Sequence, residues 1–267
     1  MSQTDRAIAR FFALTFALSL PLWLVGGRRL PLPVNLPASA LVAFVPAIAA
    51  SALVFREAGA RGAATFLRRA LDFRRIRGRR PVLLALLLAP VLYGLSYAVM
   101  RLFRLPLPER VVVSLQTGLP LFLTFMLTAT GEELGWTGYA TERMLKRSGT
   151  LRSGLLLGIV WAVWHAVPFI QTGNSATWVF WQSVKTVGMR VLLVWLYRHS
   201  GGSVLAVELY HAADNLGWAL FPNFGSHYNP LVTGALTWLA ALALMLRRPK
   251  ASGYLATPPA PDTTSPK

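Results

Sequence analysis

Eight apolar runs, each about as long as a membrane-crossing helix, constrain this sequence more than any other feature. A helix of about 20 apolar residues crosses the roughly 30 Å hydrocarbon layer of a bilayer. Hydrophobic residues make up 54% of the chain and charged residues 14%, which is too apolar for a soluble domain of 267 residues. The sequence therefore predicts an all-α, polytopic membrane protein, a bundle of about eight transmembrane helices. The runs lie at residues 7–27, 36–55, 81–103, 112–136, 153–171, 176–198, 203–222 and 229–247.

The same pattern indicates one domain and a tail. We find no internal repeat, so residues 1–250 are expected to form a single membrane-embedded helical domain. The Pro-, Thr- and Ser-rich segment 251–267 lacks the apolar content to fold and predicts a disordered cytoplasmic tail. A cleaved signal peptide is disfavoured because Arg28 and Arg29 directly follow the first apolar run. The first helix is therefore expected to remain in the protein.

Basic residues are distributed unevenly between the two sides of the predicted bundle. With a cytoplasmic N-terminus, most of the 27 Lys and Arg residues fall in cytoplasmic segments. The positive-inside rule then predicts a multi-pass cell-membrane protein with both termini cytoplasmic. The preference for Arg (23) over Lys (4) indicates a bacterium, and so its inner membrane. In segment 56–80 arginines alternate with apolar residues, which predicts an interfacial helix bound to anionic lipid of the inner leaflet. The net charge of +17 is thus explained by the membrane, and nucleic acid is not an expected partner.

Two adjacent carboxylates, Glu132 and Glu133, end the fourth apolar run in the stretch "TATGEELGW". An ionisable side chain at the centre of a bilayer costs at least about 2.5 kcal/mol, so such residues are functional candidates that face the bundle interior. Neighbouring residues of a helix point about 100° apart. One acid is therefore expected to face a common centre while the other braces the bundle.

Polar residues on two later runs complete a candidate site. In "WAVWHAVPF", His165 lies four residues after Trp161 on the same helix face. In "ELYHAADN", His211 and Asn215 are also four residues apart, and Glu208 lies about one turn earlier. Each of these motifs alone is compatible with a satisfied core residue. Together with the acid pair, on three different helices, they predict a convergent polar site within residues 120–220.

The ordered set of motifs resembles the CPBP family of intramembrane proteases, also called the Abi or type II CAAX prenyl endopeptidase family. Those motifs are Glu-Glu, aromatic-x-x-x-His and His-x-x-x-Asn on consecutive membrane segments. The resemblance implies that Glu132 is the catalytic acid and Glu133 its structural companion. It also implies that His165, His211 and Asn215 are the remaining catalytic residues.

One position departs from the family pattern. The motif EExxxR places an arginine where this chain has Thr137, so the expected partner of an acid is missing. We expect four residues to support the catalytic ones: Glu133, Thr137, Trp161 and Glu208. This departure also keeps a different class of function open, a non-proteolytic membrane scaffold or a bacteriocin-immunity protein of the same fold.

The predicted site has the groups that peptide hydrolysis needs: a base for water, a donor for the oxyanion and an acid for the leaving amine. The expected substrate is a membrane-associated peptide or lipoprotein. Zn²⁺ is a possible cofactor, because Glu132, His165 and His211 could hold it and leave a position for water. The sequence has no cysteine and no HExxH motif, and a metal-free glutamate mechanism is favoured.

Two cations inside the sixth run require partners. Lys185 and Arg190 are expected to pair with the surplus acids Glu133, Glu208 and Asp214, and one of them could replace the missing arginine. Glu208 in particular is expected to pair with Lys185 or Arg190. Helix geometry further predicts that the site lies in the cytoplasmic half of the membrane, with access from the cytoplasm or the inner leaflet.

Overall fold

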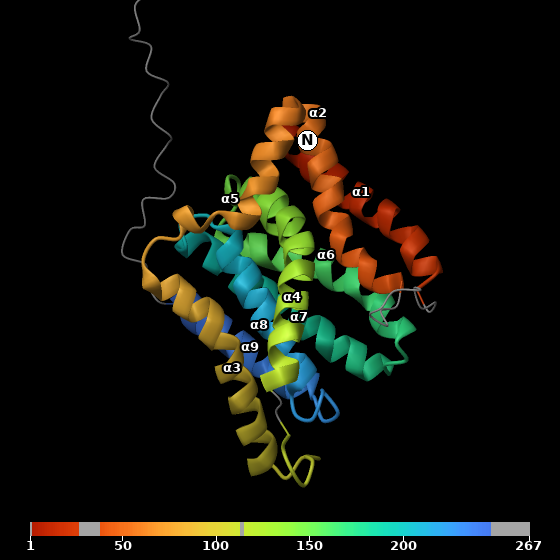
Figure 1. Ribbon diagram of the computed structural model, residues 1–267, viewed down its shortest axis with the longest axis vertical. Coiled ribbons are helices and arrows are strands. Elements are labelled where there is room, and N and C mark those ends of the chain that lie inside the picture. Colours follow the sequence, from red (N-terminus) through yellow and green to blue (C-terminus); the bar gives the residue numbers. More distant parts are fainter. Residues whose placement is uncertain (1, 27–37, 113–114, 247–267) are drawn as a thin grey trace, which may run out of the picture.

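Eight long helices make up most of the protein. The structure is a computed structural model, and it describes residues 2–26, 38–112 and 115–246 (Figure 1). This confirms the all-helical fold and the eight predicted runs, whereas the predicted tail 251–267 lies outside the described residues. The long helices are α1 (Gln3–Leu24), α2 (Val45–Leu67), α3 (Arg79–Leu102), α4 (Leu115–Glu133), α6 (Thr150–Gln171), α7 (Ala176–His199), α8 (Val204–Leu220) and α9 (Pro230–Leu246).

Several of these helices are long and apolar enough to cross a membrane. Four candidate spans are α1, the segment Ala40–Leu71, α3 and α6, and α9 is a shorter apolar helix. The other long helices carry buried charged residues, which belong to the site described below. The chain is a polytopic membrane protein.

The helices that carry the site motifs pack in the middle of the bundle. Helix α6 packs along α7, and α4 packs along α8. Figure 1 shows α4, α7 and α8 near the centre, with α1 and α2 on one side and α3 on the other. Helix α9 covers α7, and α3 covers α8.

Side-chain contacts tie one end of the bundle together, which we call the basic end. Asp72 accepts hydrogen bonds from the backbone of Val204 and Leu205 at the start of α8. Arg198 at the end of α7 donates to Thr150 at the start of α6. The described basic residues at this end are Arg6, Arg10, Arg56, Arg61, Arg68, Arg69, Arg74, Arg75, Arg77, Arg79, Arg80, Arg143, Lys146, Arg147, Arg152 and Arg198.

The other end of the bundle, which we call the opposite end, is far less charged. Gln171 at the end of α6 donates to the Trp23 carbonyl near the end of α1. Asn223, in the loop after α8, bonds to the loop after α3. The described basic residues at this end are Arg101, Arg104 and Arg110.

The basic segment 56–80 is not the single helix that its sequence predicts. Helix α2 is broken at Gly59, whose backbone has φ 67° and ψ −169°, and the chain then passes through two short 3₁₀ turns. A positive φ of this kind is readily accessible only to glycine. Leu67, Leu71 and Phe73 are 48%, 74% and 62% exposed between the arginines. That arrangement suits a membrane surface, and the binding of anionic lipid to it stays a prediction.

The acid pair lies where α4 changes into a wider helix. Residues Leu134–Thr141 form a π-helix, which continues into the short helix α5 (Glu142–Leu145). Two glycines let this region approach the start of α2. A Cβ on Gly131 would lie 2.7 Å from the Ala43 carbonyl oxygen, and one on Gly135 would lie 2.5 Å from the Pro46 backbone. Both distances are too short for a side chain, so the glycines fix the depth of the acids in the bundle.

Candidate active site

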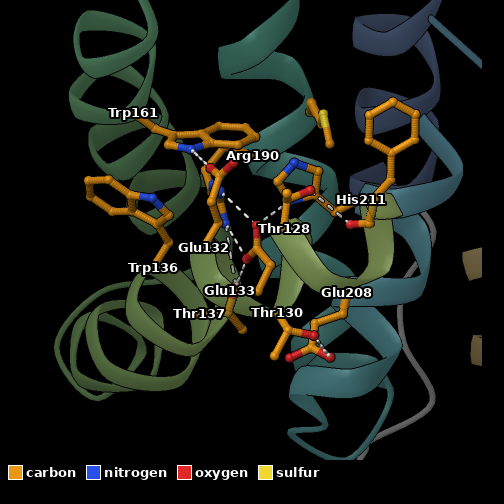
Figure 2. Close-up of polar contacts among 12 residues, drawn as sticks. Thr128, Thr130, Glu132, Glu133, Trp136, Thr137, Trp161, Arg190, Glu208 and His211 are labelled. Atoms are coloured by element: carbon orange, nitrogen blue, oxygen red, sulfur yellow. Dashed lines mark hydrogen bonds and ion pairs between the residues drawn. The ribbon is translucent and has the colours of Figure 1, made fainter. Parts of the chain in front are cut away.

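Glu132 is a nearly buried acid that contacts two residues of α6. Its Oε2 accepts a hydrogen bond of 2.9 Å from the indole Nε1 of Trp161 (Figure 2). The same oxygen lies 3.7 Å from Nε2 of His165. Only 6% of Glu132 is exposed. The indole donor holds one oxygen in place, so the carboxylate has a defined orientation toward the imidazole.

The backbone determines which ring nitrogen carries the proton when His165 is neutral. Its Nδ1 lies 3.0 Å from the carbonyl oxygen of Trp161. A carbonyl oxygen only accepts hydrogen bonds, so Nδ1 carries the proton and donates it. Nε2, the atom that faces Glu132, then has a free lone pair. The ring also stacks on Phe169 at 5.6 Å between centroids, which limits its rotation.

Glu133 is fully buried and lies behind the site residues. The guanidinium of Arg190 donates to both of its oxygens, over 2.7 and 3.0 Å, and the Thr137 hydroxyl donates over 2.5 Å. The remaining contact is to His211, whose Nδ1 lies 2.8 Å from Glu133 Oε1. A carboxylate paired with arginine accepts, so this Nδ1–H donates and leaves Nε2 of His211 for other partners.

Arg190 supplies the cation that position 137 lacks. It comes from α7 rather than from α4, and its side chain is completely buried. The guanidinium also lies over the ring of Trp161, 3.8 Å from the centroid, which adds a cation–π contact. This confirms one of the pairings that the sequence left open. Thr137 still contributes, through its hydroxyl contact to Glu133.

Trp161 joins the two halves of the site. Its ring meets His165 edge-on at 4.9 Å and His211 edge-on at 5.4 Å. The same indole donates to Glu132 and lies under Arg190. The sequence marked Trp161 as a supporting residue from its four-residue spacing to His165, but no sequence signal showed that it contacts all these groups.

The expected pairing of Glu208 with a basic residue is wrong. Its Oε2 accepts a hydrogen bond of 3.1 Å from Thr130 of α4, and its Oε1 has no hydrogen-bond partner among the described residues. Lys185 instead pairs with Asp214. Glu208 lies one turn nearer the basic end than His211, where it faces α4, as the separate contact in Figure 2 shows.

A cavity of about 380 Å³ brings the predicted catalytic residues together. Glu132, His165, His211 and Asn215 all line it, whereas Glu133 and Glu208 do not. The prediction that one acid of the pair faces the common centre agrees with this lining. The lining residues used below are Phe125, Thr128 and Glu132 of α4; His165, Phe169 and Thr172 of α6; Gln182, Lys185 and Met189 of α7; and His211, Asn215 and Trp218 of α8.

The cavity extends in a direction that the sequence did not predict. On α4 and α6 its lining continues from Glu132 and His165 to Phe125 and Thr172, toward the opposite end of the bundle. On α8 it likewise continues beyond His211 to Trp218. The lining of all these helices stops at the level of the site on the side of the basic end. Packed core residues fill that side, which argues against the predicted access from the cytoplasm or the inner leaflet.

The arrangement does not fit Zn²⁺ as it stands. Among the residues that the structure describes, no three His, Asp or Glu side chains come together in a group that could hold a metal ion. The described side chains therefore do not form a Zn²⁺ site.

The segment that holds this site is similar to a known protein family. The family model described as type II CAAX prenyl endopeptidase Rce1-like matches residues 113–217, a segment that holds every residue of the predicted site. In these residues the chain is similar to the Rce1-like family. The match confirms the resemblance drawn from the three motifs, and the Rce1-like segment runs from α4 through most of α8.

A curated relative supports the same assignment. The chain is 29% identical over 136 residues to CAAX prenyl protease 2 of Methanococcus maripaludis, which covers 48% of this chain and 49% of the relative. The chain thus matches about half the length of that relative. The segment that matches the family model contains the four cavity-lining residues Glu132, His165, His211 and Asn215.

Proposed function

We propose that the protein is an intramembrane endopeptidase that cleaves a membrane-associated peptide or lipoprotein with a water activated by Glu132. One observation carries this proposal. The Glu132 carboxylate lies at the inner end of a cavity, oriented by the Trp161 indole, with Nε2 of His165 at 3.7 Å. The Rce1-like family match supports a peptidase at this site.

The two groups that face each other both accept protons. A separation of 3.7 Å is too long for a direct hydrogen bond and suits a bridging water. Such a water donates one hydrogen to Glu132 and the other to His165 Nε2, which leaves an oxygen lone pair for the scissile carbonyl. Glu132 takes the proton as the water attacks and returns it to the leaving amine.

Asn215 and His211 are the candidates for stabilising the oxyanion. Both line the cavity that Glu132 also lines. The Asn215 amide offers an N–H without any change of charge. Because Glu133 already accepts the Nδ1 proton of His211, that ring donates into the cavity only through Nε2 of its imidazolium form. Asn215 can therefore donate to the oxyanion without being protonated first, whereas His211 cannot.

A scaffold or bacteriocin-immunity function is less well supported. Its main support in the sequence is Thr137 in place of the family arginine. Arg190 supplies that guanidinium from another helix, with two hydrogen bonds to Glu133. The acid pair therefore has the partner that an active site requires.

The test is a cleavage assay on purified protein with farnesylated and unmodified CAAX peptides and a lipid-anchored reporter peptide. Wild type, Glu132→Gln and Glu133→Gln are compared, with exposed Glu109→Gln as control. We expect Glu132→Gln to be inactive at the wild-type melting temperature and Glu133→Gln to melt lower. Cleavage by Glu132→Gln at the wild-type rate would contradict the proposal. Wild-type activity that persists after a chelator is added supports a metal-free mechanism.

A further inference from the structure

The cavity and the basic residues lie at different ends of the molecule. The cavity lining runs from His165 to Thr172 at the end of α6, and from His211 to Trp218 near the end of α8. Helices α6 and α8 both begin at the basic end, where Arg152 and Arg198 lie, so their last turns lie at the opposite end. The cavity therefore leads away from the arginine-rich end.

The side of the site that faces the basic end is closed by packed side chains. Glu133, Thr137 and Arg190 fill this side, and each of them is completely buried. Trp136 and Tyr139 of the π-helix are also completely buried below them. A peptide that came from the basic end would have to displace this cluster, including a buried ion pair.

The charge asymmetry assigns the two ends to the two sides of the membrane. Segments rich in Lys and Arg stay in the cytoplasm, and the bias is read from residues close to the ends of the spans. The described arginines at the opposite end are Arg101, Arg104 and Arg110, and Glu109 lies among them. The basic end, with its many more cations, is thus the cytoplasmic end.

We infer that the substrate enters from the non-cytoplasmic side of the membrane. The substrate is an extended segment of an exported or membrane-anchored protein, and this segment lies next to the non-cytoplasmic surface of the same membrane. This inference rests on the proposed function and specifies its substrate. A cavity of about 380 Å³ holds a few residues of extended chain and excludes a folded domain. Its walls suit such a segment, because Phe125, Phe169 and Trp218 offer apolar contacts while Gln182 and Lys185 offer polar ones.

The first experiment measures access without measuring cleavage. The chain has no cysteine, so single cysteines can be labelled without background. Cysteines are placed at Thr172 (the cavity mouth), Ser226 (the opposite end) and Arg74 (the basic end), all exposed in the structure. We expect a membrane-impermeant maleimide to label Thr172→Cys and Ser226→Cys in spheroplasts, and Arg74→Cys only in inverted vesicles. Labelling of Thr172→Cys from inverted vesicles alone would overturn the inference.

The second experiment presents the substrate from each side. A single-pass reporter carries the same cleavable segment next to the membrane in two orientations, and is expressed with wild type or Glu132→Gln. We expect wild type to cut only the reporter whose segment lies outside the cytoplasm, and Glu132→Gln to cut neither. Cleavage of the cytoplasmic reporter alone overturns the inference and leaves the proposed function intact. Equal cleavage with wild type and Glu132→Gln instead contradicts the proposed function, while the labelling result still reports the side of access.

Discussion

Arg190 is the residue on which the electrostatics of the site depend most. It donates two hydrogen bonds to Glu133 and lies over Trp161, and all of its side chain is buried. Glu133 in turn holds His211 by its Nδ1 proton. A change at Arg190 therefore affects His211, because Glu133 contacts both residues.

Removing Arg190 leaves Glu133 as a buried carboxylate without a cation. We expect Arg190→Leu to destabilise the protein by about 3–5 kcal/mol and to abolish cleavage. Position 137 offers a rescue, because the Thr137 hydroxyl lies 2.5 Å from Glu133 Oε2. Thr137→Arg should therefore restore part of the melting temperature in the Arg190→Leu background, and should lower it in wild type. A double variant that melts no higher than Arg190→Leu contradicts this account.

Asn215 should affect turnover more than stability. It lines the cavity, and its amide makes no hydrogen bond to another described residue. A donor aimed at an oxyanion is worth about 2.7–4 kcal/mol, so Asn215→Ala should lower turnover by about 100-fold or more and change substrate binding little. Glu208→Gln is the comparison on the same helix, because Glu208 does not line the cavity. It should keep most of its turnover and change little in stability, because a glutamine oxygen can still accept the hydrogen bond from Thr130. Wild-type turnover by Asn215→Ala contradicts the assigned role.

At the scale of elements, the π-helix and α5 are joined to segment 56–80 by an ion pair at the basic end. Arg69 donates to Glu142 over 2.5 Å and to the Gly138 carbonyl over 2.8 Å. Burial acts to raise the pKa of Glu142, but the Arg69 guanidinium outweighs it and lowers that pKa below its ordinary value. A carboxylate of this kind contributes stability above its unfolded pKa, and the contribution is lost as the pH falls through the folded pKa.

This ion pair gives a pH dependence with a defined sign. The melting temperature of wild type should exceed that of Glu142→Gln at neutral pH. The difference should shrink as the pH falls below about 4.3, the ordinary pKa of glutamate. Exposed Glu109→Gln is the control, and it should follow wild type at every pH. A difference that grows on acidification contradicts the role of Arg69.

The elements also show where the sequence was sufficient. The eight helices follow from apolar runs, and Glu132, His165, His211 and Asn215 were identified because polar groups in apolar runs face inward. The π-helix and the break at Gly59 were missed. The π-helix begins where α4 closely approaches the start of α2, and a contact of that kind leaves no pattern in the sequence. Spacing along α8 put Glu208 on the face of His211, whereas its actual partner depends on the neighbouring Thr130 of α4.

At the scale of the whole molecule, the concentration of cations at one end predicts an effect of anionic lipid. An arginine near an anionic surface contributes about 1 kcal/mol, and salt weakens this attraction. The melting temperature in nanodiscs should therefore rise with phosphatidylglycerol content and rise less in high salt. The double variant Arg68→Gln, Arg74→Gln should lose part of that gain, whereas Arg101→Gln, Arg104→Gln at the opposite end should keep it. Equal losses in both double variants contradict the predicted contact.

The direction of the cavity is likewise a property of the whole molecule. The sequence places the charges, but which end of the site is open depends on how much volume the side chains fill on each side. Trp136 and Tyr139 fill the side toward the basic end and are completely buried. No periodicity in the sequence records that choice, which explains why the direction of the cavity was not predicted.

The position of Arg190 has a consequence for the history of the chain. Glu133 needs one guanidinium, and both position 137 and position 190 lie within reach of it. An ancestor that lost an arginine at position 137 before gaining Arg190 would have passed through a form with a buried, unpaired acid. If the chain descends from one with the motif arginine at position 137, we expect the arginine on α7 to have come first, because only then does Glu133 keep a cation throughout. Relatives that descend from an intermediate with both arginines should still carry an arginine at position 137 and at position 190.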